Sequence, residues 1–328
     1  MTTPSTTKIL LDCDTGVDDT MAILYAALHP DIELMGVGSV WGNVDVPTAT
    51  RNSIHTLEMV GKGHLPVAQG AAGPLLRGDT YFAYFVHGDD GQGNAGTGRP
   101  VGAAAPGTAA EQIVRLARQY PGEIMLVPVG PLTNVALALA LEPELPKLIK
   151  GVSLMGGAAL APGNASYVAE ANIAHDAEAA YAVFRAPWPI TMVGLDVTMT
   201  TLITAERRRV LESGGSVGRY MSKIMQFYGD FFAETAFGEW RACMHDTMAV
   251  AAAAGTLDIR LAPNVNVEVD TSGGPAHGQT LCDLRGAYMG YPEQEGAHCR
   301  VVLEASDSIA DDVVKLIADF GDSKIPVE

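Results

Sequence analysis

The stretch Lys8–Asp19, which reads KILLDCDTGVDD, passes from a short apolar run directly into a cluster of aspartates. Its apolar part, Ile9–Cys13, is predicted to be a strand buried on both faces, because apolar and polar residues do not alternate in it. A helix is predicted over Asp18–Leu28, where apolar residues recur at helical spacing. A buried strand followed at once by a helix is typical of α/β folds, in which helices cover both faces of a parallel sheet.

The same alternation of apolar runs and helical patterns continues along the chain. Further strands are predicted at Glu33–Val40, Ile124–Val129, Val152–Met155 and Ile190–Leu195. Helices are predicted between them at about Pro47–Val60, Gly107–Gln119, Leu132–Leu141 and Ala177–Phe184. The C-terminal third is predicted to add helices near Ala205–Leu211, Val217–Phe232, Asp246–Ala254 and Ile309–Phe320, and small strands at Val265–Val269, Gln279–Asp283 and Cys299–Leu303.

These elements predict a single domain over residues 1–328, because neither an internal repeat nor a linker-like segment divides the chain. The expected architecture is an open, mostly parallel, Rossmann-like sheet flanked by helices, with additional C-terminal helices and small strands. Residues 1–7 are polar at their start and are predicted to form a disordered tail.

The composition limits the classes of partner and the compartment. The chain of 328 residues has 21 basic and 38 acidic residues, a formal net charge of −17, which repels nucleic-acid backbones and anionic membranes. No apolar run reaches the roughly 18 residues that a membrane-spanning helix needs. The four cysteines are widely scattered, which indicates reduced thiols and not a disulfide framework. We therefore expect a soluble cytoplasmic protein that binds neither nucleic acid nor membranes.

Polar and glycine-rich segments follow several of the predicted strands. Ligands of open α/β sheets bind outside the carboxyl ends of the strands, so these segments are predicted to converge on a site at one edge of the sheet. The segments are Asp14–Asp19, Trp41–Asn43, Val129–Asn134 and Met155–Gly157, followed by Asn164, Glu170 and Asn172 in one irregular stretch and by His245 and Asp246 at a helix start.

Three aspartates within six residues, Asp14, Asp18 and Asp19, would repel one another in a cleft of low dielectric constant. Without a cation, at least one of them should have a raised pKa. A hard divalent ion removes this conflict, and carboxylates together with a carbonyl favour Ca²⁺ or Mg²⁺. The cluster therefore predicts a divalent-metal site. No set of histidines and cysteines has the spacing of a zinc site.

Simpler interpretations compete for the same residues. Asp18 could cap the first helix while Asp19 favours its dipole, although a cap does not require Asp14 as well. Asp246 could likewise be a plain N-cap. An EF-hand does not fit, because Val17 stands at the position of its glycine and Ile23 at the position of its final glutamate.

Two segments interrupt the α/β pattern and are predicted to border the site, because long loops in compact domains are usually functional or mobile. Gly70–Gly107 is rich in glycine and contains His87, which could instead be a solvated loop residue. Gly229–Met244 precedes His245, which could be a partly buried surface histidine. Glu170 and Asn172 could satisfy the backbone of a nonhelical stretch. The residues interpreted as the core face of a helix are Met221, Met225, Phe227, Tyr228 and Phe231.

Taken together, the motifs resemble those of the inosine-uridine preferring nucleoside hydrolases. Leu11–Asp19 looks like the N-terminal fingerprint of that family, in which aspartates recur as D-x-D-x-x-x-D-D. The resemblance spans roughly Lys8 to Phe320 and continues, in the family's order, through Trp41–Asn43, Val127–Asn134, Leu154–Gly157, Gly163–Ala165, Val168–Ile173, Met192–Asp196 and His245-Asp246. It implies an enzyme that hydrolyses the N-glycosidic bond of ribonucleosides to free base and ribose, and a homodimer or homotetramer.

The resemblance also implies roles for individual residues. One Ca²⁺ would be bound by Asp14, Asp19, Asp246 and the backbone carbonyl of Val129, with ribose hydroxyls and a water completing its shell. Asp14 would also act as general base on the Ca²⁺-bound water.

Further roles concern the substrate. Asp18 and Asn172 would hold the ribose diol, with Asn43 near it, and Asn164 and Glu170 would bind the 5′-hydroxyl. His245 is our candidate for the acid that assists the leaving base, with His87 lining the base side of the pocket. Asp12 receives no contact and is interpreted as structural.

Several positions depart from the family's pattern. Val129 stands where many members have threonine, which a backbone ligand tolerates. Ala171 lies where an aromatic residue is common, and Gly229 and Ala233 lie where some members place tyrosines over the base. These departures affect the base side of the site and not the ribose or metal side. The sequence therefore does not predict which base is preferred.

Two other functions compete with the hydrolase. A metal-dependent phosphatase of the haloacid-dehalogenase type also has two aspartates one residue apart, but it expects Gly then Thr where Thr15-Gly16 stand in reverse order. It would also leave the Asp18-Asp19 pair unexplained. A non-catalytic nucleoside- or ribose-binding protein would keep the metal site without turnover, and the intact Asp14 argues against it.

Overall fold

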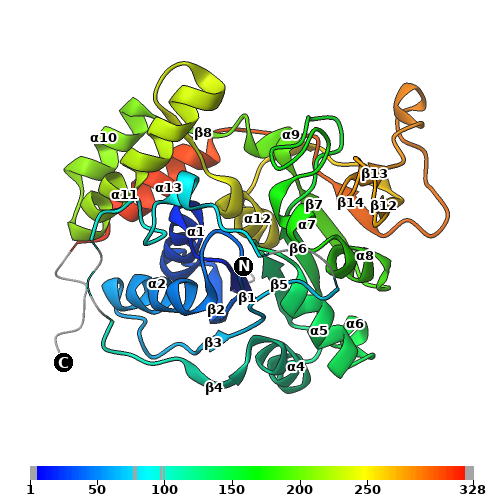
Figure 1. The fold of residues 1–328 in the computed structure, drawn as a ribbon, viewed down its shortest axis with the longest axis horizontal. Helices are drawn as coiled ribbons and strands as arrows, with labels where there is room; N and C mark the ends of the chain where they lie inside the picture. Colours follow the sequence, from blue (N-terminus) through cyan, green and yellow to red (C-terminus); the bar gives the residue numbers. More distant parts are fainter. Residues whose placement is uncertain (1–5, 77–79, 97, 99, 322–328) are drawn as a thin grey trace, which may run out of the picture.

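The computed structural model describes residues 6–76, 80–96, 98 and 100–321. A twisted sheet forms the centre of the molecule. Within the described chain the sheet has nine strands in the order β11-β14-β7-β6-β5-β1-β2-β3-β4 (Figure 1). All neighbouring strands are parallel except β11, which pairs antiparallel with β14. The strands are β1 (Thr7–Cys13), β2 (Ile32–Ser39), β3 (Val67–Gln69), β4 (Ala105–Thr108), β5 (Ile124–Pro128), β6 (Gly151–Met155), β7 (Ile190–Val193), β11 (Asn264–Val265) and β14 (Cys299–Val301).

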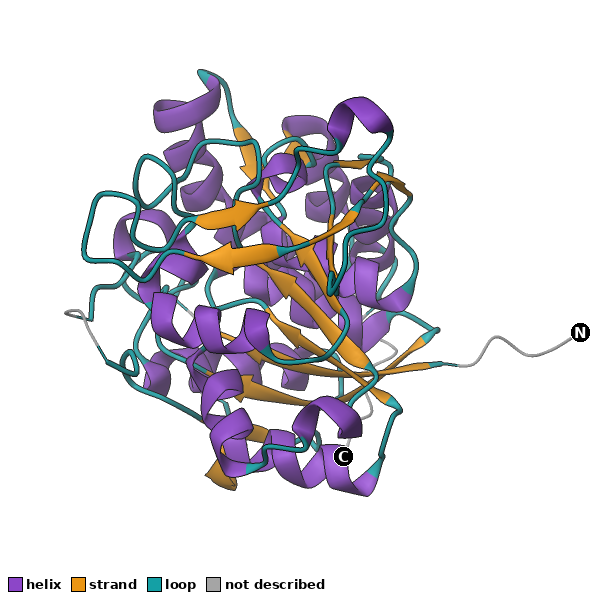
Figure 2. Cartoon of the chain, turned by 90° about the vertical axis from the view of Figure 1, so that its right-hand side faces the viewer, coloured by secondary structure: helices purple, strands orange, loops and turns teal. Residues whose placement is uncertain are grey.

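Helices lie on both sides of this sheet (Figure 2). They are α1 (Val17–Leu28), α2 (Val46–Met59), α3 (Tyr84–His87), α4 (Ala109–Gln119), α5 (Thr133–Leu141), α6 (Leu145–Leu148), α7 (Ala171–His175), α8 (Ala177–Arg185), α9 (Leu195–Thr198), α10 (Ala205–Ser213), α11 (Ser216–Phe232), α12 (His245–Ala254) and α13 (Ile309–Ala318). A turn of π-helix, Ala233–Phe237, directly follows α11, and a short 3₁₀ turn spans Ala287–Met289. The predicted α/β architecture is thus confirmed.

The side chains of β1 supply both halves of the hydrophobic core, because successive residues of a strand point to opposite faces. Ile9 and Leu11 belong to the cluster formed with α1, α11, α12 and α13. Leu10 belongs to the cluster on the other face, formed with α4, α5 and α8. The absence of apolar–polar alternation in this strand therefore has the predicted cause, burial on both sides.

The small C-terminal strands are more dispersed than predicted. The predicted strand Val265–Val269 is two strands: β11 joins the central sheet, whereas β12 (Val267–Val269) pairs with β13 (Thr280–Cys282) in a separate ribbon. The other two-stranded ribbons pair β8 (Leu202–Thr204) with β9 (Arg241–Cys243), and β10 (Ile259–Leu261) with β15 (Glu304–Ala305).

Other predicted boundaries also change. Strands β3 and β4 lie in segments for which no strand was predicted, and helix α7 forms in the stretch around Glu170 that was predicted to be nonhelical. Of the predicted tail, residues 1–5 lie outside the described residues, while Thr7 already belongs to β1. Among the described residues, none of the helices is long and apolar enough to cross a bilayer.

The strand order places a switch point beside β1. From β1 the chain builds the sheet outward through β2, β3 and β4, and it then returns to the other side of β1 with β5. In open α/β sheets, the loops that leave the strands in opposite directions at such a point enclose a crevice. Here those loops carry Asp14–Asp19 after β1 and Val129–Asn134 after β5.

Candidate active site at the carboxyl edge of the sheet

Four aspartates from two distant parts of the sequence lie buried beyond the carboxyl end of β1. Asp14, Asp18 and Asp19 come from the β1–α1 turn and the first turn of α1, and Asp246 from the first turn of α12. Their exposed fractions are 1%, 6%, 0% and 3%, respectively. Helices α1 and α12 pack against each other, and this contact brings Asp246 to the cluster.

The carboxylate of Asp14 is enclosed by backbone. Its Oδ2 accepts a hydrogen bond from the backbone N–H of Asn43 at 2.6 Å. A Cβ at Gly42 would collide with this carboxylate, and one at Gly130 would lie 2.8 Å from its Oδ1. The glycines of the segments Trp41–Asn43 and Val129–Asn134 are therefore needed because the chain passes too close to Asp14 for a side chain.

Asp19 holds the start of α1. Its Oδ2 accepts hydrogen bonds from the backbone N–H of Gly16 at 2.8 Å and from Nδ2 of Asn43 at 3.1 Å. Gly16 is the N-cap, so the simpler interpretation, in which Asp18 caps this helix, is wrong. A capping role does apply to Asp19, but it uses only one of its two oxygens.

Asp18 is bound by a residue that the sequence did not indicate. The hydroxyl of Tyr228, on α11, donates a hydrogen bond to Oδ2 of Asp18 at 3.1 Å. Tyr228 is buried, as predicted for the core face of that helix, but its hydroxyl reaches the site. Spacing on α11 identified the buried face, and nothing in the sequence shows that one hydroxyl on that face meets α1.

The four carboxyl groups share an electrostatic conflict. Burial and the neighbouring Asp19 raise the pKa of Asp14 well above its usual range, and the same causes raise the pKa of Asp18 to about 8. Burial, followed by Asp18, Asp19 and Asp14, also raises the pKa of Asp246 well above its usual range. This is the effect expected for carboxylates confined together without a counter-charge.

Several carboxylate oxygens fit a cation. Oδ1 of Asp14, of Asp18 and of Asp19 is buried and has no hydrogen-bond partner, which is costly unless another group satisfies it. Asp18, Asp19 and Asp246 can each place one oxygen so that the three lie within 4.8 Å of one another. Asp14 is close enough to this group for Asp19 to raise its pKa. An all-oxygen donor set of this kind suits a hard divalent cation.

The start of α7 forms another wall of the site. Glu170 is its N-cap and accepts hydrogen bonds from the backbone N–H groups of Asn172 and Ile173, at 2.9 and 3.2 Å. Oδ1 of Asn164 accepts from the backbone N–H of Ala171 at 2.9 Å. Glu170 thus does satisfy local backbone groups, as its alternative interpretation held. These groups belong to a helix and not to a nonhelical stretch. Burial raises the pKa of Glu170 to about 7.

Asn172 joins this wall to the end of β5. Its Nδ2 donates to the backbone carbonyl of Val129 at 2.9 Å and to that of Met155 at 3.1 Å. These contacts join the start of α7 to the carboxyl ends of two strands, β5 and β6. Val129, Met155 and Asn172 therefore meet at the sheet edge, where the segments that carry them were predicted to converge.

Asp12, which was predicted to be structural, hydrogen-bonds to another loop of the fold. It is buried on β1, and its Oδ1 accepts from Nδ2 of Asn134 at 2.9 Å. Oδ1 of Asn134 in turn accepts from the backbone N–H of Ala71 at 2.8 Å. The pair therefore joins the loop after β5 to β1 and to the segment after β3.

His87 is buried and neutral, not a solvated loop residue. Its Nδ1 accepts a hydrogen bond from the backbone N–H of Val17 at 3.1 Å, so that nitrogen carries no proton. Burial, followed by the nearby His245, lowers the pKa of His87 to about 3. The 3.9 Å separation between Nδ1 and Oδ1 of Asp18 is therefore a contact with a neutral ring and not an ion pair.

His245 begins α12 and is also buried, which rules out a surface position. Its Nδ1 lies 2.7 Å from the hydroxyl of Thr198 on α9. Burial lowers the pKa of His245 to about 4, so the ring is neutral at neutral pH. Thr198 is a second residue that the sequence did not indicate.

The two segments that were predicted to border the site lie beside these histidines. Phe85, from the first loop, contacts Phe231 at the end of α11 with ring centroids 5.8 Å apart. Tyr228 lies 5.2 Å from the ring of His87, and Phe232 lies 6.0 Å from that of His245. An aromatic wall therefore borders the acidic cluster on the side where both histidines lie.

The backbone at Gly229 on α11 is covered by Trp240. A Cβ at position 229 would collide with the indole ring of Trp240. Arg208 also lies over this ring, 5.0 Å from its centroid. At position 229, where some family members have a tyrosine, the space is therefore occupied by the ring of Trp240.

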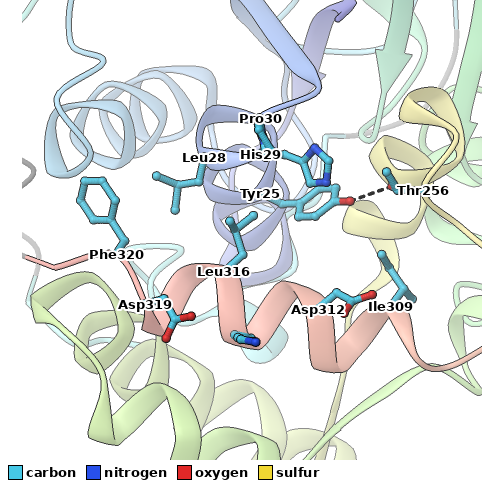
Figure 3. Close-up of a pocket in the computed structure, with 11 residues that line it drawn as sticks. Tyr25, Leu28, His29, Pro30, Thr256, Ile309, Asp312, Leu316, Asp319 and Phe320 are labelled. Atoms are coloured by element: carbon cyan, nitrogen blue, oxygen red, sulfur yellow. Dashed lines mark hydrogen bonds between the residues drawn. The ribbon is translucent and has the colours of Figure 1, made fainter. Parts of the chain in front are cut away.

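A separate cavity of about 550 Å³ lies at the opposite end of α1 from Asp18 and Asp19 (Figure 3). It lies between that end of α1 and α13, and Leu28 and Leu316 are among the residues that line it. Tyr25 also faces it and donates or accepts a hydrogen bond with Thr256 at 2.7 Å. The cavity contains none of the predicted site residues.

The sequence of the chain matches a known family. The family model described as inosine-uridine preferring nucleoside hydrolase matches residues 9–310. The chain is 36% identical over 302 residues to the inosine-uridine preferring nucleoside hydrolase of Leishmania major, a match that covers 90% of this chain and 92% of that protein. It is 39% identical over 249 residues to "Probable uridine nucleosidase 2" of Arabidopsis thaliana, covering 75% and 77% of the two chains.

A solved structure agrees over the same length. The purine-preferring ribonucleoside hydrolase from Gardnerella vaginalis superposes with a TM-score of 0.86 at 30% sequence identity, covering 95% of this chain and 98% of that one. Sequence and fold thus agree over nearly the whole chain. The chain belongs to the inosine-uridine preferring nucleoside hydrolase family and is a nucleoside N-ribohydrolase.

Proposed function

We propose that the chain hydrolyses ribonucleosides to free base and ribose by a Ca²⁺-dependent mechanism in which Asp14 is the general base. The observation that carries this proposal is the buried group of Asp14, Asp18, Asp19 and Asp246, whose carboxylates have unsatisfied oxygens and raised pKa values. Such a group is costly to keep ionised unless a cation offsets its charge.

The residues proposed to hold Ca²⁺ are Asp14, Asp19, Asp246 and the backbone carbonyl of Val129. Asp18 is close enough to Asp19 and Asp246 to contribute an oxygen as well. Nδ2 of Asn172 uses one lone pair of the Val129 carbonyl, and a carbonyl oxygen has two. When bound, the cation supplies positive charge that offsets the carboxylates and makes a nearby water more acidic.

Asp14 is suited to take a proton from the attacking water. Its Oδ2 is held by the N–H of Asn43, while its Oδ1 is free of hydrogen bonds. The water oxygen forms a bond to C1′ of the ribose as the bond from C1′ to the base nitrogen breaks, and the bonding pair leaves with the base. The proton lost by the water passes to Asp14.

Ribose would be held by residues that converge on the same edge of the sheet. Asp18, Asn172 and Asn43 are proposed to bind the 2′- and 3′-hydroxyls, and Asn164 and Glu170 the 5′-hydroxyl. Nearby carboxylates would stabilise the oxocarbenium-like ribose of the transition state. Glu170 and Asn164 would have to accept a ribose hydroxyl in addition to the backbone N–H groups that they hold now.

The leaving base would be met by the two neutral histidines. Because both rings are neutral at neutral pH, we propose that His245 assists the base by donating a hydrogen bond from a ring N–H. His87 would line the pocket beside it. The names of the similar proteins refer to uridine, to inosine and uridine, and to purines, so they support no single base preference.

A panel of nucleosides tests the reaction itself. Incubation with inosine, uridine, cytidine and adenosine is expected to release ribose from at least one of them, measured as reducing sugar. The panel also ranks the bases by kcat/KM. Binding of a nucleoside by calorimetry, with no base released from any of the four, would show a binding protein and refute the hydrolase.

Tyr228→Phe should weaken the site without disturbing the core, because phenylalanine keeps the buried ring and removes only the hydroxyl that holds Asp18. A hydrogen bond to a charged group is worth roughly 1.5–3 kcal/mol, so we expect kcat/KM to fall by about 10-fold or more. Tyr25→Phe is the matched control, because Tyr25 lies on the same helix as Asp18 and its hydroxyl bonds Thr256 outside the site. Equal losses in both variants would contradict a role of Tyr228 in the site.

His245→Ala should depend on the leaving group. We expect kcat to fall by roughly 10²-fold or more with inosine or uridine, whose bases leave poorly, because acid assistance typically contributes that much. The loss should be much smaller with p-nitrophenyl riboside, whose leaving group needs no proton. Steady-state kinetics on both substrates measure this, and equal losses would rule out His245 as the group that assists departure.

A further inference from the structure

Thr198 is a fully buried residue at the end of the short helix α9, and its side chain points to the histidine that begins α12. Its Oγ1 lies 2.7 Å from Nδ1 of His245, from which it is separated by 47 residues in sequence. Helices α9 and α12 are in contact, so this hydrogen bond joins two elements that pack together.

Neighbouring threonines of the same segment use their hydroxyls differently. Thr200 and Thr201 both donate to the carbonyl of Val197, at 2.8 and 3.2 Å. Such local bonds to the preceding turn are the usual behaviour of threonine near a helix end. Thr198 makes its hydrogen bond with the ring of His245, and therefore acts on that side chain.

A hydrogen bond to one nitrogen fixes the rotation of a buried imidazole. If the ring of His245 turned over, the hydroxyl of Thr198 and Nδ1 would both lose a partner in a place that water does not reach, which costs free energy. Phe232 confines the ring from the side, at 6.0 Å between centroids and an interplanar angle of 48°. With Nδ1 held by Thr198, Nε2 is the ring nitrogen left to meet a ligand.

The second histidine of the site is held in the same way. Nδ1 of His87 accepts the backbone N–H of Val17 at 3.1 Å, so its Nε2 is likewise the nitrogen that remains for a ligand. Both imidazoles are therefore anchored through the same ring atom, one by backbone and the other by a threonine hydroxyl.

We infer that Thr198 is a positioning residue of the active site, which holds His245 through Nδ1 so that Nε2 faces the departing base. The inference rests on the role proposed above for His245. It predicts that the loss of this hydroxyl slows departure of poor leaving groups while ribose binding is retained, since no ribose-binding residue is touched.

The test compares Thr198→Val, Thr198→Ser and Thr201→Val with the wild-type chain on inosine or uridine and on p-nitrophenyl riboside. Thr198→Val is expected to lower kcat on the nucleoside by about 10-fold, the effect of one lost hydrogen bond, with KM nearly unchanged and p-nitrophenyl riboside little affected. Thr198→Ser should restore most of the activity. Thr201→Val, which removes a buried hydroxyl from the same segment, should not show this dependence on the leaving group.

Two outcomes would overturn the inference: equal losses on both substrates in Thr198→Val, or no rescue by serine. If His245→Ala itself affected both substrates equally, the proposed role of His245 would fail, and a measurement independent of turnover would decide on Thr198. The ¹⁵N signal of Nδ1 in His245, assigned by its absence from His245→Ala, should move in Thr198→Val and not in Thr198→Ser. An unchanged signal in Thr198→Val would refute the positioning role.

Discussion

Replacing Asp14 with asparagine is expected to lower kcat on any accepted nucleoside by roughly 10³-fold or more, because the variant loses the proposed general base and one proposed metal ligand. Asparagine keeps the size of the side chain and an oxygen that can accept the N–H of Asn43. The fold should therefore be retained, which circular dichroism checks. Single-turnover kinetics would measure the chemical step, and binding of ribose would show that the pocket is intact.

Asp45→Asn is the matched control for this substitution. Asp45 caps α2 by accepting the backbone N–H of Thr48 at 2.7 Å, and asparagine is an equally good N-cap. The control should therefore keep its activity. Turnover by Asp14→Asn within a few-fold of that of the control would remove Asp14 as the base.

Removal of the proposed Ca²⁺ should have the second large effect, on stability as well as on activity. A ligand that binds only the folded chain at 100 times its dissociation constant stabilises it by about 2.7 kcal/mol. For a chain of this size, that corresponds to a rise in Tm of roughly 5 °C. We therefore expect the chelated protein to be inactive and to unfold at lower temperature, with both properties restored by added Ca²⁺. Differential scanning calorimetry measures the shift.

The direction of the pH dependence follows from the raised carboxyl pKa values. Burial and Asp19 raise the pKa of Asp18 to about 8 in the folded chain, so folding without a cation favours the protonated acid. That stability is present at low pH and is lost as the pH rises from the usual range of aspartate through about 8. The stabilisation by Ca²⁺ should therefore be larger at pH 8 than at pH 5.

Asp19→Asn and Asp45→Asn separate the site from general effects of calcium on an acidic protein. The Tm shift should be largely lost in Asp19→Asn, because Oδ1 of Asp19 is one of the unsatisfied oxygens, and should persist in Asp45→Asn. A Tm that does not respond to chelation or to added Ca²⁺ would refute the calcium site.

The central part of the fold could be predicted from the sequence because each of its strands and helices shows a recognisable pattern of apolar residues within a few positions. The run Ile9–Cys13 predicted the end of β1 correctly, and the helical spacing after Asp18 predicted the start of α1 to within one residue. These two boundaries enclose the turn that carries Asp14. Strands such as β3, three residues long, carry no comparable pattern, and α7 is too short to show helical periodicity. The tertiary fold decides the conformation of such segments.

The candidate site was predictable where its residues lie in one motif, and not where tertiary packing supplies them. The aspartates after β1 and the segment Val129–Asn134 could be recognised because they directly follow predicted strands. Tyr228 and Thr198 could not, because their contacts with Asp18 and His245 join residues 210 and 47 positions apart. The cytoplasmic location and the homodimer or homotetramer stay predictions.

The packing of Trp240 on Gly229 also constrains how the base side of this enzyme can change. A tyrosine introduced at position 229 alone would collide with the indole ring, so that variant should be poorly folded whatever its effect on the base. The same tyrosine requires the indole ring to move, and replacing Trp240 with a small residue removes the collision. The two positions are thus coupled, and a route to a new base preference through position 229 is expected to change residue 240 as well.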